Sequence, residues 1–201
     1  MKEINKQQPS KGSVVNDKPK NYNEVIEFLD NNWYLWQASP TLERVKKLDQ
    51  ELGNPSAKLN TILVAGSNGK SLTINLTAKL LKEEGLSVGT FYSPHLLTYN
   101  ERISVNNETI SNKVFTDLAN EVLATAQKLK INGLDSYELL TMMAILHFSR
   151  QEIDAAIFEV HEGGTFNPVN ILQAKAVAIT RITDNDVNAS EEKIKNIIIL
   201  V

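Results

Sequence analysis

A short glycine-rich segment, Gly66–Ser71 with the sequence GSNGKS, has the residue types that a phosphate-binding loop requires. Small residues let successive backbone N–H groups converge on an anion, and a lysine can reach the outer phosphates of a nucleotide. The segment lies between an apolar run at 60–66 and an amphipathic run at 72–84, which is the strand–loop–helix context of such loops. Its glycine spacing is shorter than the common form. A tight strand-to-helix turn with a surface lysine explains the same residues, so the loop alone leaves both interpretations open.

Apolar and amphipathic runs alternate along the chain from about residue 22. Continuous apolar runs predict buried strands at 60–66, 87–93, 154–160 and 176–182. Apolar residues at helical spacing predict helices at 22–33, 41–52, 72–84, 111–129 and 136–150. Residues 102–111 alternate in hydropathy and predict a hairpin-like excursion or an irregular loop. This order indicates an α/β fold, a three-layer P-loop-type domain with a mainly parallel sheet.

Composition limits the classes of partner that the chain can have. The 201 residues carry a formal net charge of −3 without a basic stripe, which argues against nucleic acid as a partner. The absence of a long apolar run and of a secretory signal predicts no membrane association. With no cysteine, the sequence fits a reducing, cytoplasmic compartment. Residues 1–20 are mostly polar and predict a disordered tail before a single domain at 21–201.

Four further segments resemble a known family in the same order as its motifs. They are YSPHLLTYNERISVNNETIS (92–111), SYELLTMMAILHF (136–148), FEVHEGGTFNPVN (158–170) and AVAITRITDND (176–186). With the GSNGK loop, they resemble the dihydrofolate synthase/folylpolyglutamate synthase family of the Mur ligase superfamily. The resemblance covers about residue 22 to the end, and implies the Mur-ligase-like central ATPase domain without the family's C-terminal domain.

The resemblance implies an ATP- and Mg²⁺-dependent ligase of folate metabolism. Such an enzyme adds L-glutamate to dihydropteroate or to a reduced folate through an acyl-phosphate intermediate. A second polypeptide would then supply the missing C-terminal domain. Two alternatives stay open: a Mur ligase proper, favoured by the hydroxyl of Ser71 directly after Lys70, and a catalytically inactive nucleotide-binding relic.

The family's functional residues map onto this sequence position by position. The implied ATP-binding residues are Gly66, Ser67, Asn68, Gly69, Lys70 and Ser71, with Lys70 as the catalytic cation. The implied Mg²⁺ ligands are Ser93, Glu159 and Asp186. The implied substrate-binding residues are His95, Arg102, Tyr137, Glu138 and Asn167.

Several positions depart from the family pattern or have a plainer interpretation. Asp186 stands where the family has histidine, and Thr165 and Asn167 replace an arginine and an aspartate, which favours the inactive relic. Arg102 could instead pair with a neighbouring glutamate, and Glu138 could serve only the start of a helix. Leu72 is expected in the core. The strands at 154–160 and 176–182 are expected to expose apolar surface, which predicts limited solubility or a partner.

Overall fold

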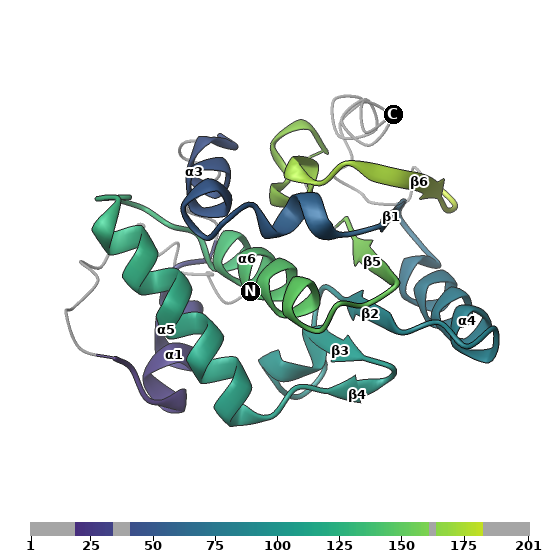
Figure 1. Ribbon diagram of the computed structural model, residues 1–201, viewed down its shortest axis with the longest axis horizontal. Helices are drawn as coiled ribbons and strands as arrows, with labels where there is room; N and C mark the ends of the chain where they lie inside the picture. Colours follow the sequence, from purple (N-terminus) through teal and green to yellow (C-terminus); the bar gives the residue numbers. More distant parts are fainter. Residues whose placement is uncertain (1–18, 34–40, 161–163, 183–201) are drawn as a thin grey trace, which may run out of the picture.

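The structure is a computed structural model that describes residues 19–33, 41–160 and 164–182 (Figure 1). The predicted tail at 1–20 lies almost wholly outside these ranges, and so does Asp186. The helices are α1 (Tyr22–Asn31), α3 (Glu43–Glu51), α4 (Lys70–Glu83), α5 (Asn112–Lys128) and α6 (Ser136–Arg150). The strands are β1 (Thr61–Ala65), β2 (Val88–Phe91), β3 (Ile103–Val105), β4 (Glu108–Thr109), β5 (Ala155–Glu159) and β6 (Ala174–Ile179). Short 3₁₀ helices occupy Pro55–Lys58, Tyr99–Arg102, Gly164–Phe166 and Pro168–Ile171.

The strands form one mixed sheet in the order β4-β3-β2-β5-β1-β6. Strands β2, β5, β1 and β6 are parallel, which confirms the predicted mainly parallel sheet, and β3 and β4 are antiparallel to their neighbours. The β3–β4 hairpin turns at Asn106 and Asn107, both of which have a positive φ. Asparagine tolerates this conformation better than most residues, so the hairpin is the correct alternative for 102–111.

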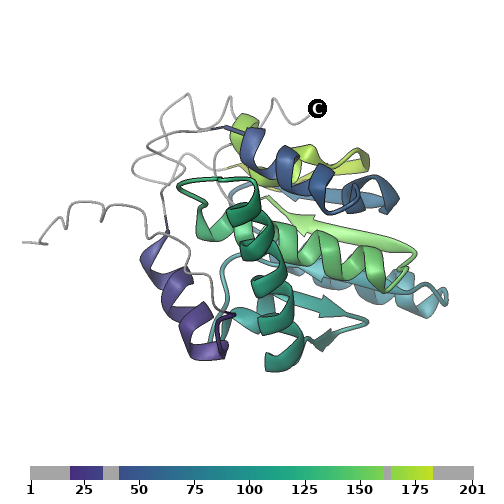
Figure 2. The same cartoon turned by 60° about the vertical axis from the view of Figure 1, so that its left-hand side comes forward.

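Helices cover both faces of the sheet, as Figures 1 and 2 show. On one face α4 packs through Ile74 and Ala78 against Val64, Val88 and Ile157. The larger core lies on the other face, where α6 separates the sheet from α5, α1 and α3. Because α6 has neighbours on all sides, nearly all of its residues are buried, including the polar Ser136, Glu138 and Thr141. The predicted three-layer α/β arrangement is therefore confirmed.

Of the two strands that were predicted to expose apolar surface, only one does so. Strand β5 is buried along its whole length, because it lies in the middle of the sheet between β2 and β1. Strand β6 is the edge strand and is partly exposed, as expected. Among the described residues, no helix is long and apolar enough to cross a bilayer.

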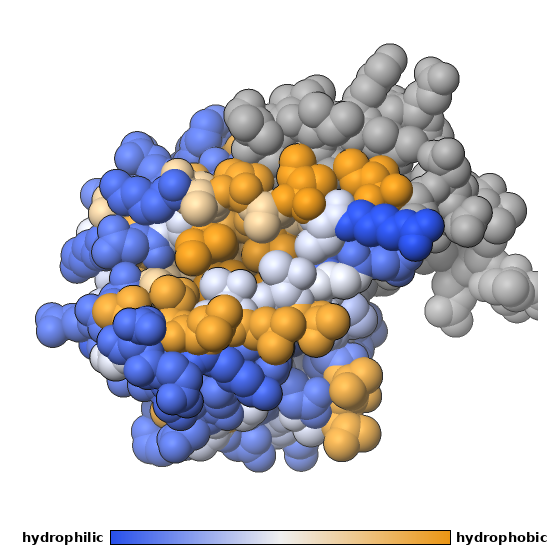
Figure 3. All heavy atoms as spheres, turned by 90° about the vertical axis from the view of Figure 1, so that its right-hand side faces the viewer, coloured by the Kyte–Doolittle hydropathy of each residue, from blue (hydrophilic) through white to orange (hydrophobic). Residues whose placement is uncertain are grey.

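A leucine stripe runs along the outer face of α4, formed by Leu72, Leu76 and Leu80 at 65%, 52% and 69% exposure. Leu72 is therefore not a core residue. Figure 3, which views the molecule from the side of α4 and β6, shows apolar side chains gathered on this face. An exposed patch of this kind marks an interaction surface or a tendency to aggregate.

We therefore expect the 201-residue chain to self-associate as its concentration rises, measured by static light scattering. Replacing all three stripe leucines by glutamine should reduce this association without lowering the melting temperature, because the stripe makes few core contacts and glutamine is a good helix former. A matched control is Ile74→Gln on the buried face of the same helix, which should unfold the protein at a lower temperature. A wild-type chain that stays monomeric at high concentration would contradict this prediction.

Candidate functional site

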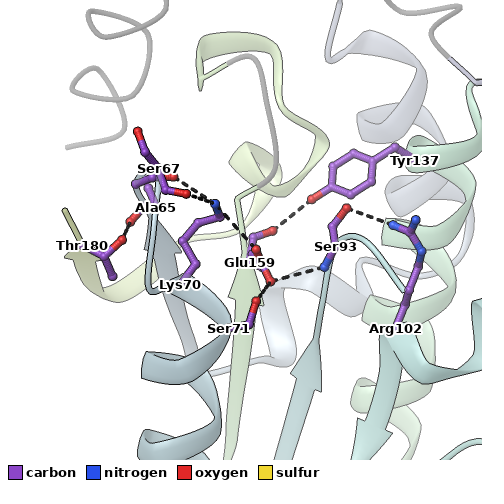
Figure 4. A network of polar contacts seen from close by, with 10 residues as sticks. Ala65, Ser67, Lys70, Ser71, Ser93, Arg102, Tyr137, Glu159 and Thr180 are labelled. Carbon is purple, nitrogen blue, oxygen red and sulfur yellow. Dashed lines mark hydrogen bonds and ion pairs between the residues drawn. The ribbon is translucent and has the colours of Figure 1, made fainter. Parts of the chain in front are cut away.

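The predicted phosphate loop lies between β1 and α4, at the carboxyl end of the sheet (Figure 4). Gly66 and Gly69 both have a positive φ, at 130° and 90°, so the turn depends on residues without a Cβ. The ammonium group of Lys70 folds back over the loop and donates to the carbonyls of Gly66 (2.9 Å) and Ser67 (3.3 Å). The strand–loop–helix context predicted for this segment is confirmed.

Only part of the loop is open to a ligand in this conformation. The backbone N–H groups of Ser67 and Asn68 donate to the carbonyl of Arg181, at 3.0 and 3.2 Å. Phosphate binding at these two amides would therefore require the loop to separate from Arg181. The amides of Lys70 and Ser71 lie in the first turn of α4, where N–H groups lack intrahelical partners and the helix dipole favours an anion.

Glu159 lies at the centre of a polar network beside the loop (Figure 4). Its carboxylate accepts hydrogen bonds from the Ser71 hydroxyl (3.2 Å) and the Ser93 amide (3.3 Å), and Lys70 Nζ lies 3.8 Å from Oε1. Tyr137 donates its hydroxyl to the Glu159 backbone carbonyl at 3.0 Å. These residues meet because the carboxyl ends of parallel strands share one edge of the sheet, which is where α/β proteins bind ligands.

Electrostatics at Glu159 are set mainly by burial. Desolvation raises the pKa of this carboxyl, while the Ser93 amide, Lys70 and Ser71 oppose the shift. A buried carboxylate needs cationic compensation, and Lys70 supplies part of it. The Glu159 carboxylate could therefore be stabilised further by binding a second cation.

Two of the three predicted metal ligands, Ser93 and Glu159, lie within the described residues. Glu159 and Ser93 are adjacent, and their oxygens are the hard donors that Mg²⁺ prefers. Within the described ranges there is no group of three or more His, Cys, Asp or Glu side chains that could hold a metal ion. The third expected ligand, Asp186, lies outside those ranges, so the Mg²⁺ site stays a prediction.

Arg102 and His95 lie on the other side of Ser93. Arg102 donates through Nε to His95 Nδ1 and through an Nη1 hydrogen to Ser93 Oγ, both at 2.9 Å. The sequence left open that Arg102 pairs with a neighbouring glutamate. Glu101 is not that partner, because its carboxylate accepts hydrogen bonds from the amides of residues 96–98 instead. Glu108 is also not paired with Arg102, because it lies exposed on β4.

Tyr137 and Glu138 are neighbours in sequence but point to different parts of the molecule. Tyr137 reaches Glu159, whereas Glu138 forms a capping box with Asp135 and a bidentate ion pair with Arg44. The structure therefore places Glu138 at the start of α6, in the plainer of its two predicted roles, and not at the Glu159 network. Asn167 is buried and accepts a hydrogen bond from the Val169 amide at the start of a 3₁₀ helix. Neither residue makes a described contact with Glu159.

Three residues contribute to this region without having been predicted from the sequence. Thr180 donates its hydroxyl to the Ala65 carbonyl at 3.0 Å, and Arg181 binds the loop amides. Trp33 stacks on Tyr99 and lies against Arg102. The motif at 176–186 could have pointed to Thr180 and Arg181, but no sequence signal joined Trp33 to Arg102.

Comparisons with known proteins agree with the fold. No family model matches the chain. The chain is 36% identical over 164 residues to the dihydrofolate synthase/folylpolyglutamate synthase of Bacillus subtilis, covering 80% of this chain and 38% of that protein. The folylpolyglutamate synthase of Mycobacterium tuberculosis complexed with ADP superimposes with a TM-score of 0.76 at 28% identity, over 85% of this chain and 39% of that one. A folylpolyglutamate synthase complex with AMPPCP and folate superimposes with a TM-score of 0.73 at 27% identity, over 80% of this chain and 40% of that one.

The fold matches the corresponding α/β part of solved folylpolyglutamate synthases, as the sequence predicted. The chain is a homologue of the dihydrofolate synthase/folylpolyglutamate synthases, and it spans about two fifths of the length of the relatives that it matches.

Proposed function

We propose that this chain is the ATP-binding part of a carboxylate–amine ligase that adds L-glutamate to dihydropteroate or to a reduced folate. The observation that carries the proposal is the Lys70–Glu159–Ser93 network directly beside a glycine-rich loop, in a homologue of folylpolyglutamate synthases. Related structures contain ADP, or AMPPCP together with folate, which supports binding of both substrates. We further propose that the ligase acts in the cytoplasm.

The proposed reaction has two steps. A carboxylate oxygen of the acceptor forms a bond to the γ-phosphorus of ATP while the bond to the ADP oxygen breaks. The glutamate amine then attacks the acyl phosphate, and an amide and phosphate are released. Lys70 would stabilise the charge on the transferred phosphoryl group, and the amides at the start of α4 would hold the phosphates. Mg²⁺, held by Ser93, Glu159 and Asp186, would neutralise phosphate charge.

The chain covers 38% of the Bacillus subtilis relative. We propose that the glutamate is bound by the region of the enzyme that corresponds to the rest of that relative. An inactive nucleotide-binding relic is the second candidate, favoured by the neutral Thr165 and Asn167 and by the engagement of two loop amides with Arg181. A Mur ligase proper rests on Ser71 alone, and the Ser71 hydroxyl is bound to Glu159.

Isothermal titration of the chain with ATP and Mg²⁺ tests the proposal. We expect Mg²⁺-dependent ATP binding that Lys70→Ala weakens by about 10- to 100-fold, because a hydrogen bond to a charged group contributes about 1.5–3 kcal/mol. Lys79→Ala is the matched control, since Lys79 lies exposed on the same helix. No ATP binding, or equal binding by the Lys70→Ala variant, would rule the proposal out.

An activity assay separates the ligase from the relic. The chain would be incubated with ATP, Mg²⁺, dihydropteroate and glutamate, with and without a separately expressed C-terminal domain of a relative. Release of ADP that requires dihydropteroate supports the ligase. ATP binding without turnover in either mixture supports the relic.

A further inference from the structure

Arg102 is a deeply buried cation that has no role in the two proposed reaction steps. Its residue exposure is only 3%. Within the described residues, its guanidinium contacts neutral groups: His95 Nδ1, Ser93 Oγ, and the rings of Trp33 and Tyr99 at 5.0 and 5.6 Å from Cζ. None of these partners carries the negative charge that a buried guanidinium normally requires.

A buried cation without a counter-ion is costly, because several kcal/mol of hydration are lost and not returned. The same chain shows the usual solution at Arg44, whose partly buried guanidinium donates through Nε to both carboxylate oxygens of Glu138. Arg102 has no such pair among the described residues. Burial accordingly lowers the pKa of Arg102.

Three acidic side chains of this region have other hydrogen-bond partners. Asp30 accepts a hydrogen bond from the Tyr99 hydroxyl at 2.6 Å. Glu101 accepts from the amides of residues 96–98. Glu159 accepts from Ser71 and Ser93 and faces Lys70. The charge of Glu159 stabilises the Arg102 cation from a distance. In the part of the chain that the structure describes, however, no carboxylate forms a direct ion pair with the guanidinium.

The guanidinium is also held in a fixed orientation. Arginine has five N–H donors, and the contacts to His95 and Ser93 occupy two of them, one on Nε and one on Nη1. Its Cζ lies over the rings of Trp33 and Tyr99. A guanidinium that is held by these contacts is preorganised to bind a carboxylate through its remaining donors.

Lys70 and Arg102 lie on opposite sides of the Glu159–Ser93 pair, as Figure 4 shows. Resting on the proposed function, we infer that Arg102 binds the carboxylate of the acceptor substrate, while Lys70 binds the phosphates of ATP. Two cations on opposite sides of one site reduce the repulsion between two anionic substrates that must react with each other. The carboxylate would then meet the γ-phosphorus above Ser93 and Glu159.

Binding of an acid and its neutral amide distinguishes this role from simple packing. Pteroate and its carboxamide differ only in the charged group, and their affinities for the 201-residue chain with AMPPCP would be measured by calorimetry and by tryptophan fluorescence. We expect wild type to bind pteroate about 10- to 100-fold more tightly than the amide. In Arg102→Met the ratio should fall to near one, and Arg102→Lys should restore it in part. Arg150→Met, which removes an arginine that pairs with Glu121 at the surface, should leave the ratio unchanged.

Two results would overturn the inference while the proposed folate binding stands. One is equal affinity of wild type for the acid and the amide, and this measurement does not depend on a variant that folds. The other is an unchanged ratio in an Arg102→Met protein whose circular dichroism matches wild type. Failure of wild type to bind either compound would instead reject the proposed substrate class together with the role of Arg102.

Discussion

Replacing Glu138 by alanine is expected to lower the free energy of unfolding by about 3–5 kcal/mol, because removing one member of a buried ion pair leaves the other charge uncompensated. Glu138 and Arg44 have 2% and 14% of their side-chain surface exposed, and both carboxylate oxygens lie within 3.0 Å of Arg44 Nε. The substitution also removes the acceptor of the Asp135 amide at the start of α6. Urea denaturation followed by circular dichroism would measure the loss.

Two variants show whether the loss comes from the buried pair. Replacing both partners, as Arg44→Leu with Glu138→Leu, should cost much less than Glu138→Ala alone, because no buried charge remains. Glu121→Ala breaks the exposed pair with Arg150 and should cost at most about 1 kcal/mol. If Glu138→Ala kept full stability but lost pteroate affinity, Glu138 would be a substrate-binding residue as the resemblance implied, and the structural role would be wrong.

Replacing Gly66 by alanine is expected to abolish measurable ATP binding and to destabilise the fold. A Cβ at this position would lie 2.1 Å from Thr180 Oγ1 and 3.1 Å from the Thr180 backbone nitrogen. The φ of 130° adds strain for any residue with a side chain. Thr180 and Arg181 hold the end of β1 and the loop amides, so a displaced Thr180 would change the shape of the loop itself. We expect a stability loss of about 2–5 kcal/mol from strain and overpacking combined.

Gly53→Ala is the matched control for this effect. Gly53 also has a positive φ, at 88°, but a Cβ there would meet nothing within 4 Å. The Gly53→Ala substitution should lower the free energy of unfolding by only about 1–2 kcal/mol and leave the ATP affinity unchanged. Adding Thr180→Ala to Gly66→Ala should recover part of the stability, since it removes the closest atom. Normal ATP affinity in Gly66→Ala would show that the loop does not depend on its fit against Thr180.

The sequence by itself determined the local structure and the order of the elements. Apolar runs and helical spacing predicted the strands and helices, because these periodicities reflect which side chains a strand or helix must bury. The position of the GSNGKS loop between β1 and α4 followed from the same patterns. The alternation of strands and helices also predicted a mainly parallel sheet, which brings the ends of β1, β2 and β5 to one edge. The proximity of Lys70, Ser93 and Glu159 is a consequence of that edge.

Only the tertiary structure decided which partner each polar side chain has. Tyr137 and Glu138 are adjacent on α6, but about 100° of helical rotation separates them, so one faces Glu159 and the other faces Arg44. Strand order placed β5 in the centre and β6 at the edge, which located the exposed surface, and it brought Arg181 against the loop amides. The enclosure of Arg102 by Trp33, Tyr99 and His95 joins the residues just after α1 to the segment after β2. Contacts between segments that are far apart in the sequence depend on how helices and strands pack. The hydropathy pattern of a single segment carries no information about that packing.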